Sequence, residues 1–181
     1  VDGFDISENA ILFYYLKEAA IKTMDFEEYM NFFTEIKNKI RNSQYEALKV
    51  VNKTLITLYW EIGREIYLKQ QEKGWGKSVV EILAKELQAE FPKVKGFSAS
   101  NIWRKRNFFV TYKCSENLAP LVREISWSKN IAIMEKCKDE LEREFYIKMT
   151  KKYGWTKNVL INNIENKSYE KYLLNQTNFE E

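Results

Sequence analysis

The chain has 181 residues, of which 45% are hydrophobic and 30% charged, with a formal net charge of +3. This length suits one well-buried domain with an appended helical segment and is too short for two large domains. The absence of histidine excludes Ser-His and Cys-His nucleophile pairs and the commonest metal ligand. Two cysteines are too few for a disulfide framework or a four-ligand zinc site.

The spacing of apolar residues predicts an all-α fold. Residues 1–23 are expected to be an N-terminal extension with a small helix, because Met24 opens a fresh acidic turn. Apolar residues three and four apart predict a helix over 26–40 and a long scaffold helix over about 43–72. The string Gly74-Trp75-Gly76 is expected to end the scaffold helix, since glycine permits a left-handed cap.

Residues 77–113 predict a helix-turn-helix unit that packs on the scaffold helix. Its first helix is expected to run from about Lys77 to Phe91 and to stop at Pro92. After a turn that is slightly longer than usual, Ser98 is a suitable N-cap for a second helix that ends near Lys113.

The remaining sequence also predicts helices. Either Ser126 or Ser128 is expected to cap a helical region that reaches Tyr153 as one long or two short helices. A last helix is predicted over 157–166, followed by a polar segment. The main helical domain is therefore expected to span 24–175, with residues 176–181 as a tail.

The first apolar stretch, residues 10–16, is short and lacks the basic leader of a signal peptide. No segment approaches the ~18 apolar residues of a membrane span. Two thiols in a chain of this length are typical of reduced intracellular cysteines. We therefore expect a cytoplasmic protein that does not contact membranes.

The window from residue 91 to residue 115 contains six basic residues and no acid, whereas the rest of the chain is net negative. Arg and Lys bind phosphates or guanine edges, and Asn pairs with adenine. On a helical wheel of residues 98–113, polar and basic side chains share one face, opposite Ile102 and Phe109. This pattern predicts a nucleic-acid-binding surface, with DNA favoured over RNA. The expected binding residues are Lys93, Lys95, Ser100, Asn101, Arg104, Lys105 and Asn107.

A solvated basic face is the plain alternative, and other polar residues have structural interpretations. Arg106 falls toward the apolar side of the wheel, so we expect it to pair with a carboxylate at the edge of the core. Pairs of glutamates one turn apart are commonplace on helices and are expected to be solvated or salt-bridged. No catalytic site, metal site or cofactor is predicted.

A series of short strings runs through the chain in a fixed order. They are Val51-Asn52, Leu58-Tyr59-Trp60-Glu61-Ile62-Gly63-Arg64-Glu65-Ile66, Gly74-Trp75-Gly76, Phe91-Pro92, Lys95-Gly96-Phe97-Ser98, Asn101-Ile102-Trp103-Arg104, Ile125-Ser126-Trp127-Ser128 and Phe145-Tyr146. Together they resemble the N-terminal domain of the YhcG-like family of bacterial proteins over about residues 30–175. Relatives often carry His where Lys129 stands and an apolar residue such as Met where Lys105 stands.

The resemblance implies a helical domain that precedes a PD-(D/E)XK-type nuclease domain and that binds nucleic acid or mediates assembly. The chain ends about where a linker would begin, so we expect the nuclease in cis or in trans and no catalytic activity in the chain itself. Our first hypothesis is a DNA-binding domain that positions this nuclease. The alternative is a protein-interaction module. It would be either a dimerisation domain built on the helix from Ser43 to Gln71 or a small mobile-element inhibitor that docks on a nuclease complex.

Overall fold

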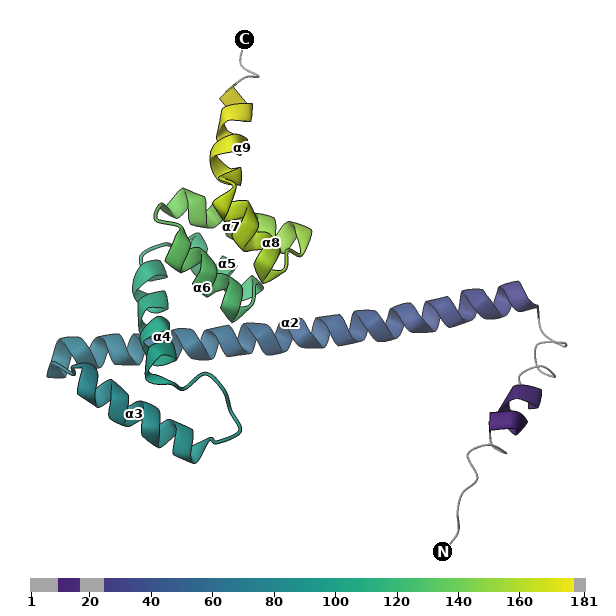
Figure 1. Cartoon of the computed structure of the whole chain (residues 1–181), viewed down its shortest axis with the longest axis horizontal. Coiled ribbons are helices and arrows are strands. Elements are labelled where there is room, and N and C mark those ends of the chain that lie inside the picture. The colour runs from purple at the N-terminus through teal and green to yellow at the C-terminus, as the bar shows by residue number, and fades with distance from the viewer. Residues whose placement is uncertain (1–9, 17–24, 178–181) are drawn as a thin grey trace, which may run out of the picture. The chain divides into compact units, whose positions relative to one another are not determined.

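The computed structural model describes residues 10–16 and 25–177 and divides the chain into an N-terminal unit, residues 1–48, and a C-terminal unit, residues 49–181. Every regular element in the described ranges is helical, which confirms the predicted all-α class (Figure 1). Residues 10–16 form the described part of the small helix expected within 1–23. Residues 1–9, 17–24 and 178–181 lie outside the described residues.

Helix α2 (Phe26–Lys73) is continuous, so the prediction of separate helices over 26–40 and 43–72 is wrong. No glycine or proline lies between the two predicted segments, and a serine inside a helix costs only a few tenths of a kcal/mol, roughly, relative to good helix formers. The acidic start is as expected, because the Asp25 carboxylate accepts a hydrogen bond of 2.9 Å from the amide of Glu27. The predicted end is also confirmed, since Gly74 adopts a φ of 65° directly after Lys73.

Helices α3 (Lys77–Glu90) and α4 (Ala99–Tyr112) lie within a residue or two of their predicted bounds. The two helices pack against each other beside the C-terminal part of α2 (Figure 1). Ser98 caps α4 as predicted, because its hydroxyl accepts a hydrogen bond from the amide of Asn101.

Short helices complete the C-terminal unit. They are α5 (Leu118–Leu121), the 3-10 helix η1 (Val122–Glu124), α6 (Trp127–Lys136), α7 (Glu140–Tyr153), α8 (Lys157–Glu165) and α9 (Ser168–Thr177). The region up to Tyr153 is thus two helices, and α8 agrees with the predicted last helix. Helix α9 was not predicted, because its sequence is polar. Its first turn is fixed by Tyr169, whose ring lies 5.4 Å from that of Phe145 and whose amide donates to the Tyr146 hydroxyl.

The larger core of the C-terminal unit is built around aromatic rings. Trp127 on α6 makes edge contacts with Tyr59 on α2, at 4.8 Å between ring centroids, and with Phe108 on α4, at 5.3 Å. The amides of Asn52 and Asn130 donate to main-chain carbonyls around η1, so carbonyls of this irregular stretch that lack a helical partner are hydrogen-bonded. A smaller core joins α2, α3 and α4. Its buried members are Ile66, Val80, Ala84 and Ile102.

Helix α4 approaches α2 most closely at Gly63. A β-carbon placed on Gly63 would overlap the main-chain carbonyl oxygen of Lys105 and would lie 3.2 Å from the amide nitrogen of Arg106. Only glycine lets the two helix backbones meet this closely. The contact therefore fixes which side of α4 faces the core.

Replacing Gly63 with alanine should destabilise the C-terminal unit. Alanine gains about 1 kcal/mol from helix propensity, but the overlap with the α4 backbone should exceed this gain and lower the free energy of unfolding by roughly 1–3 kcal/mol. Urea unfolding followed by circular dichroism measures the difference. Gly76→Ala is the matched control, because no atom lies within 4 Å of its added β-carbon. A Gly63→Ala variant more stable than the unaltered chain would contradict the close packing.

Candidate functional site

The buried face of α4 differs from the face expected on the helical wheel. Lys105 was expected on the polar face of the wheel, whereas its side chain is buried, together with those of Ile102, Phe108 and Tyr112. The reason is the contact between α4 and Gly63, which turns the Lys105 segment of α4 toward α2. The polar surface of α4 is consequently narrower than predicted.

Lys105 is a buried cation, so its assignment to the nucleic-acid-binding surface is wrong. Its side chain is 0% exposed, and its ammonium donates a hydrogen bond of 2.6 Å to the carbonyl of Gly96. The same ammonium lies 4.3 Å from the ring centroids of Tyr59 and Phe97, at distances typical of cation–π contacts. Burial lowers the pKa of Lys105 to about 8. Lys105 thus ties the turn before α4 to α4 itself and is not available to phosphate.

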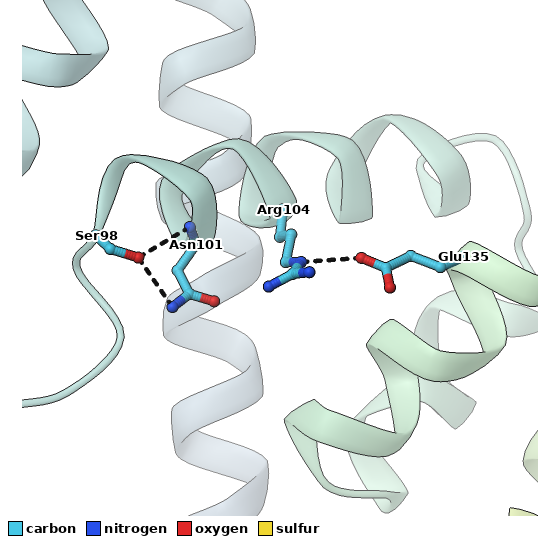
Figure 2. A network of polar contacts seen from close by, with 4 residues as sticks. All are labelled: Ser98, Asn101, Arg104 and Glu135. Carbon is cyan, nitrogen blue, oxygen red and sulfur yellow. Dashed lines mark hydrogen bonds and ion pairs between the residues drawn. The ribbon is translucent and has the colours of Figure 1, made fainter. Parts of the chain in front are cut away.

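Two other expected binding residues are engaged within the C-terminal unit, as Figure 2 shows. The guanidinium of Arg104 forms an ion pair of 2.9 Å with Glu135 on α6, and both side chains remain partly exposed. The side-chain amide of Asn101 donates to the Ser98 hydroxyl at 3.1 Å, next to the cap of α4. An exposed ion pair contributes only about 0–1 kcal/mol, so Arg104 remains free to exchange Glu135 for another anion.

Arg106 has the structural role that was predicted, but its partner is different. Its Nε donates a hydrogen bond of 2.9 Å to the side-chain carbonyl of Gln70, and its Nη1 donates to Asn107. The expected carboxylate is replaced by amide oxygens, because Gln70 is the α2 side chain that reaches the guanidinium. Lys113, at the end of α4, donates to the hydroxyl of Tyr67 at 2.8 Å.

The remaining expected binding residues lie at the surface. Lys93 and Lys95 are exposed in the turn before α4, and Ser100 and Asn107 are exposed on α4 itself. These four side chains, with Arg104 beside them, are what the structure leaves of the predicted basic surface.

The C-terminal unit also contains an apolar groove of about 690 Å³, which sequence reasoning missed. It lies between the C-terminal part of α2, helix α3 and the turn before α4. Its lining residues are Leu58, Glu61, Ile62, Glu65, Ile66, Lys69, Trp75, Leu83, Leu87, Phe91, Val94 and Phe97. A second, smaller hollow of about 300 Å³ adjoins it along α2 and shares Leu58. That hollow is lined by Val50, Val51, Thr54, Leu55 and Leu58.

The N-terminal unit carries an exposed apolar face on α2. Its members are Phe26, Tyr29, Phe33, Ile36 and Ile40, all of them exposed. The spacing of this face was recognised in the sequence, but its exposure was not, because spacing alone does not say what covers a helix. Phe33 is 49% exposed and Ile40 is 54% exposed.

The described residues contain no group of three or more acidic or cysteine side chains placed to hold a metal ion. Cys114 is exposed, and Cys137 is buried with its pKa raised to about 12, mainly by burial. Within the same residues, no helix has both the length and the apolar composition required to cross a bilayer.

Residues 35–171 match the family model described as the DUF1016 N-terminal domain. This match confirms the resemblance to the N-terminal domain of the YhcG-like family. Comparisons with curated proteins and with solved structures found no match.

The buried Lys105 should make stability depend on pH. Its pKa is about 8 in the folded chain and returns to about 10.4 on unfolding. Between these values Lys105 binds its proton in the unfolded chain and not in the folded one, so this residue should raise the free energy of unfolding as pH rises, by at most about 1.4 kcal/mol per pH unit. The buried Cys137 thiol, whose pKa is raised, acts in the opposite direction in the upper part of this range. Urea unfolding across this range should show that the free energy of unfolding of Lys105→Met falls relative to that of the unaltered chain as pH rises, whereas Lys93→Met, at an exposed lysine, keeps the profile of the unaltered chain. Identical pH profiles for Lys105→Met and the unaltered chain would contradict this account of Lys105.

Proposed function

We propose that this chain, which belongs to the DUF1016 N-terminal domain family, is a protein-interaction module that self-associates through the apolar face of α2. The observation that carries the proposal is the exposure of that face in the N-terminal unit. Under this proposal, a PD-(D/E)XK-type nuclease domain in cis or in trans would be brought together in two copies.

The apolar face has the geometry of a helix-pairing surface. Successive residues of an α-helix are rotated by about 100°, so the five positions from Phe26 to Ile40 fall within about 80° of the helix surface. They follow the spacing of three, four, three and four that is typical of paired helices. The rings of Tyr29 and Phe33 stack on each other with centroids 6.4 Å apart, which makes the face broad and continuous.

The opposite side of the same helix segment is polar. Asn31 and Asn38 lie there, as does Glu35, which pairs with Lys39. A helix that is apolar on one side and polar on the other buries its apolar side against a partner. Exposed apolar surface of this extent marks an interaction site in a folded protein.

A nucleic-acid-binding surface is a second candidate function. Lys93 and Lys95 favour it, because both are exposed in a stretch of the chain that has no acidic residue. With Arg104 released from Glu135, three cations would line this side of α4. Such a surface would bind the phosphate backbone with little dependence on base sequence.

Self-association should be lost when acidic side chains replace apolar residues of the α2 face. The double variant Phe33→Glu, Ile40→Glu replaces two apolar side chains per copy with carboxylates. Burial of each apolar side chain stabilises the dimer by roughly 1.5–3 kcal/mol. The dissociation constant should rise about a hundredfold or more, and light scattering should report a change from dimer to monomer. Asn31→Glu with Asn38→Glu is the matched control, since it adds the same charge to the opposite side. A monomeric unaltered chain, or a double variant that stays dimeric, would refute the proposal.

Binding of duplex DNA, if present, should depend on the two exposed lysines. The variant Lys93→Glu, Lys95→Glu should weaken binding, and it should reduce the slope of log affinity against log salt by about 2, because about two phosphate contacts are lost. Fluorescence anisotropy across a salt series measures both quantities. Lys152→Glu with Lys157→Glu, two exposed lysines remote from α4 in sequence, makes the same change in total charge and is the control. An unchanged slope in the double variant would exclude this surface.

A further inference from the structure

We infer that the apolar groove of the C-terminal unit is filled by the apolar face of α2 from a second copy of this chain, with the two α2 helices antiparallel. This inference rests on the proposed self-association and adds the register in which the two α2 helices pair. It follows from three observations: the positions of the apolar residues along α2, the hollows on one part of the helix, and the bulky side chains on another.

The apolar positions of α2 are symmetric about residue 49. Ile36 and Ile62 lie thirteen residues on either side of it, and Ile40 and Leu58 lie nine residues on either side. Phe33 and Ile66 are sixteen and seventeen residues away. In an antiparallel pair of identical helices, residue i of one copy faces residue j of the other while j faces i, with a constant sum of i and j. This symmetry therefore places Ile36 opposite Ile62 and Ile40 opposite Leu58, with Phe33 one residue from the position that faces Ile66.

The hollows and the protruding side chains are complementary in the same register. The large groove includes Ile62 and Ile66 from α2, and the facing positions are Ile36 and Phe33 of the second copy. A groove of about 690 Å³ lies within the size range of sites that enclose an apolar ligand, and large aromatic and aliphatic side chains suit it. The smaller hollow ends at Leu58 and faces Ile40.

A parallel pairing lacks this complementarity. Each residue would face its own equivalent, so the groove of one copy would lie opposite the groove of the other and Phe33 would lie opposite Phe33. The hollows would then stay unfilled, with a loss of dispersion contacts. The antiparallel pairing sets Phe33, Ile36 and Ile40 of each copy against the hollows of the other.

Disulfide trapping distinguishes these arrangements. Two variants are made in chains that carry Cys114→Ser, so that Cys137, which is buried, is the one remaining native cysteine. One variant has Ile40→Cys, and the other has Leu58→Cys and a tag that distinguishes it. Both substituted positions are exposed. The two chains are mixed, allowed to exchange and mildly oxidised. A disulfide requires Cα atoms within about 7 Å, so the antiparallel register should yield the mixed product and little of either same-variant product. Replacing Leu58→Cys by Lys53→Cys, on the opposite side of the helix, should abolish the mixed product.

The other outcomes overturn the inference in separable ways. Same-variant products alone would show a parallel pair, and a dimer by light scattering that gives no disulfide would place the contact elsewhere. Either result leaves the proposed self-association standing. A monomer by light scattering would remove both the register and the proposed function.

Discussion

The close contact between Gly63 and the backbone of Lys105 is the constraint on which the C-terminal unit depends. It brings α4 directly against α2 and thereby determines which side chains of α4 enter the core. Lys105 must then be buried, and its ammonium is satisfied by the Gly96 carbonyl and by two aromatic rings. The turn before α4 is held in place by the same contacts, and this turn forms one wall of the apolar groove. A single glycine thus connects the helix crossing, the buried cation and the shape of the groove.

The same contact changes how the basic residues of the stretch 91–115 are interpreted. Six cations in an acid-free stretch suggest a strong positive surface, but one is buried, one is paired with Glu135 and one is held by Gln70. Phosphate binding depends on the number of cations that can reach the backbone, and that number is smaller than the sequence suggests. Exposed apolar surface, by contrast, is plentiful along α2. The balance of surface chemistry therefore favours association with protein.

Local sequence signals predicted the ends of α3 and α4 well. The orientation of α4 depends on long-range contacts, which local signals do not show. Pro92, Ser98 and Gly74 mark helix ends through their own backbone preferences, so α3 and α4 were predicted closely. The orientation of α4 could not be predicted in this way, because a wheel counts Lys105 as polar and carries no information about Gly63. The resemblance to the YhcG-like family implied an apolar residue at the position of Lys105, and the burial of Lys105 agrees with that implication.

The apolar groove was beyond prediction from local pattern, since its lining comes from α2, α3 and a turn that are separate in the sequence. The continuity of α2 was missed because a new helix was predicted to begin at Ser43, although a serine is tolerated inside a helix. What the sequence did contain was the apolar spacing of α2. The structure shows that these apolar residues are exposed, and this exposure is the reason for proposing an interface there.

In the proposed dimer, a second copy covers the apolar face of α2 in solution. Hydrogen–deuterium exchange of the unaltered chain at low and high protein concentration tests this coverage most directly, because exchange reports local opening of the helix. We expect peptides from residues 26–48 and from residues 50–66 to gain protection together as concentration rises. Exchange over residues 26–48 that is independent of concentration would contradict the proposed dimer.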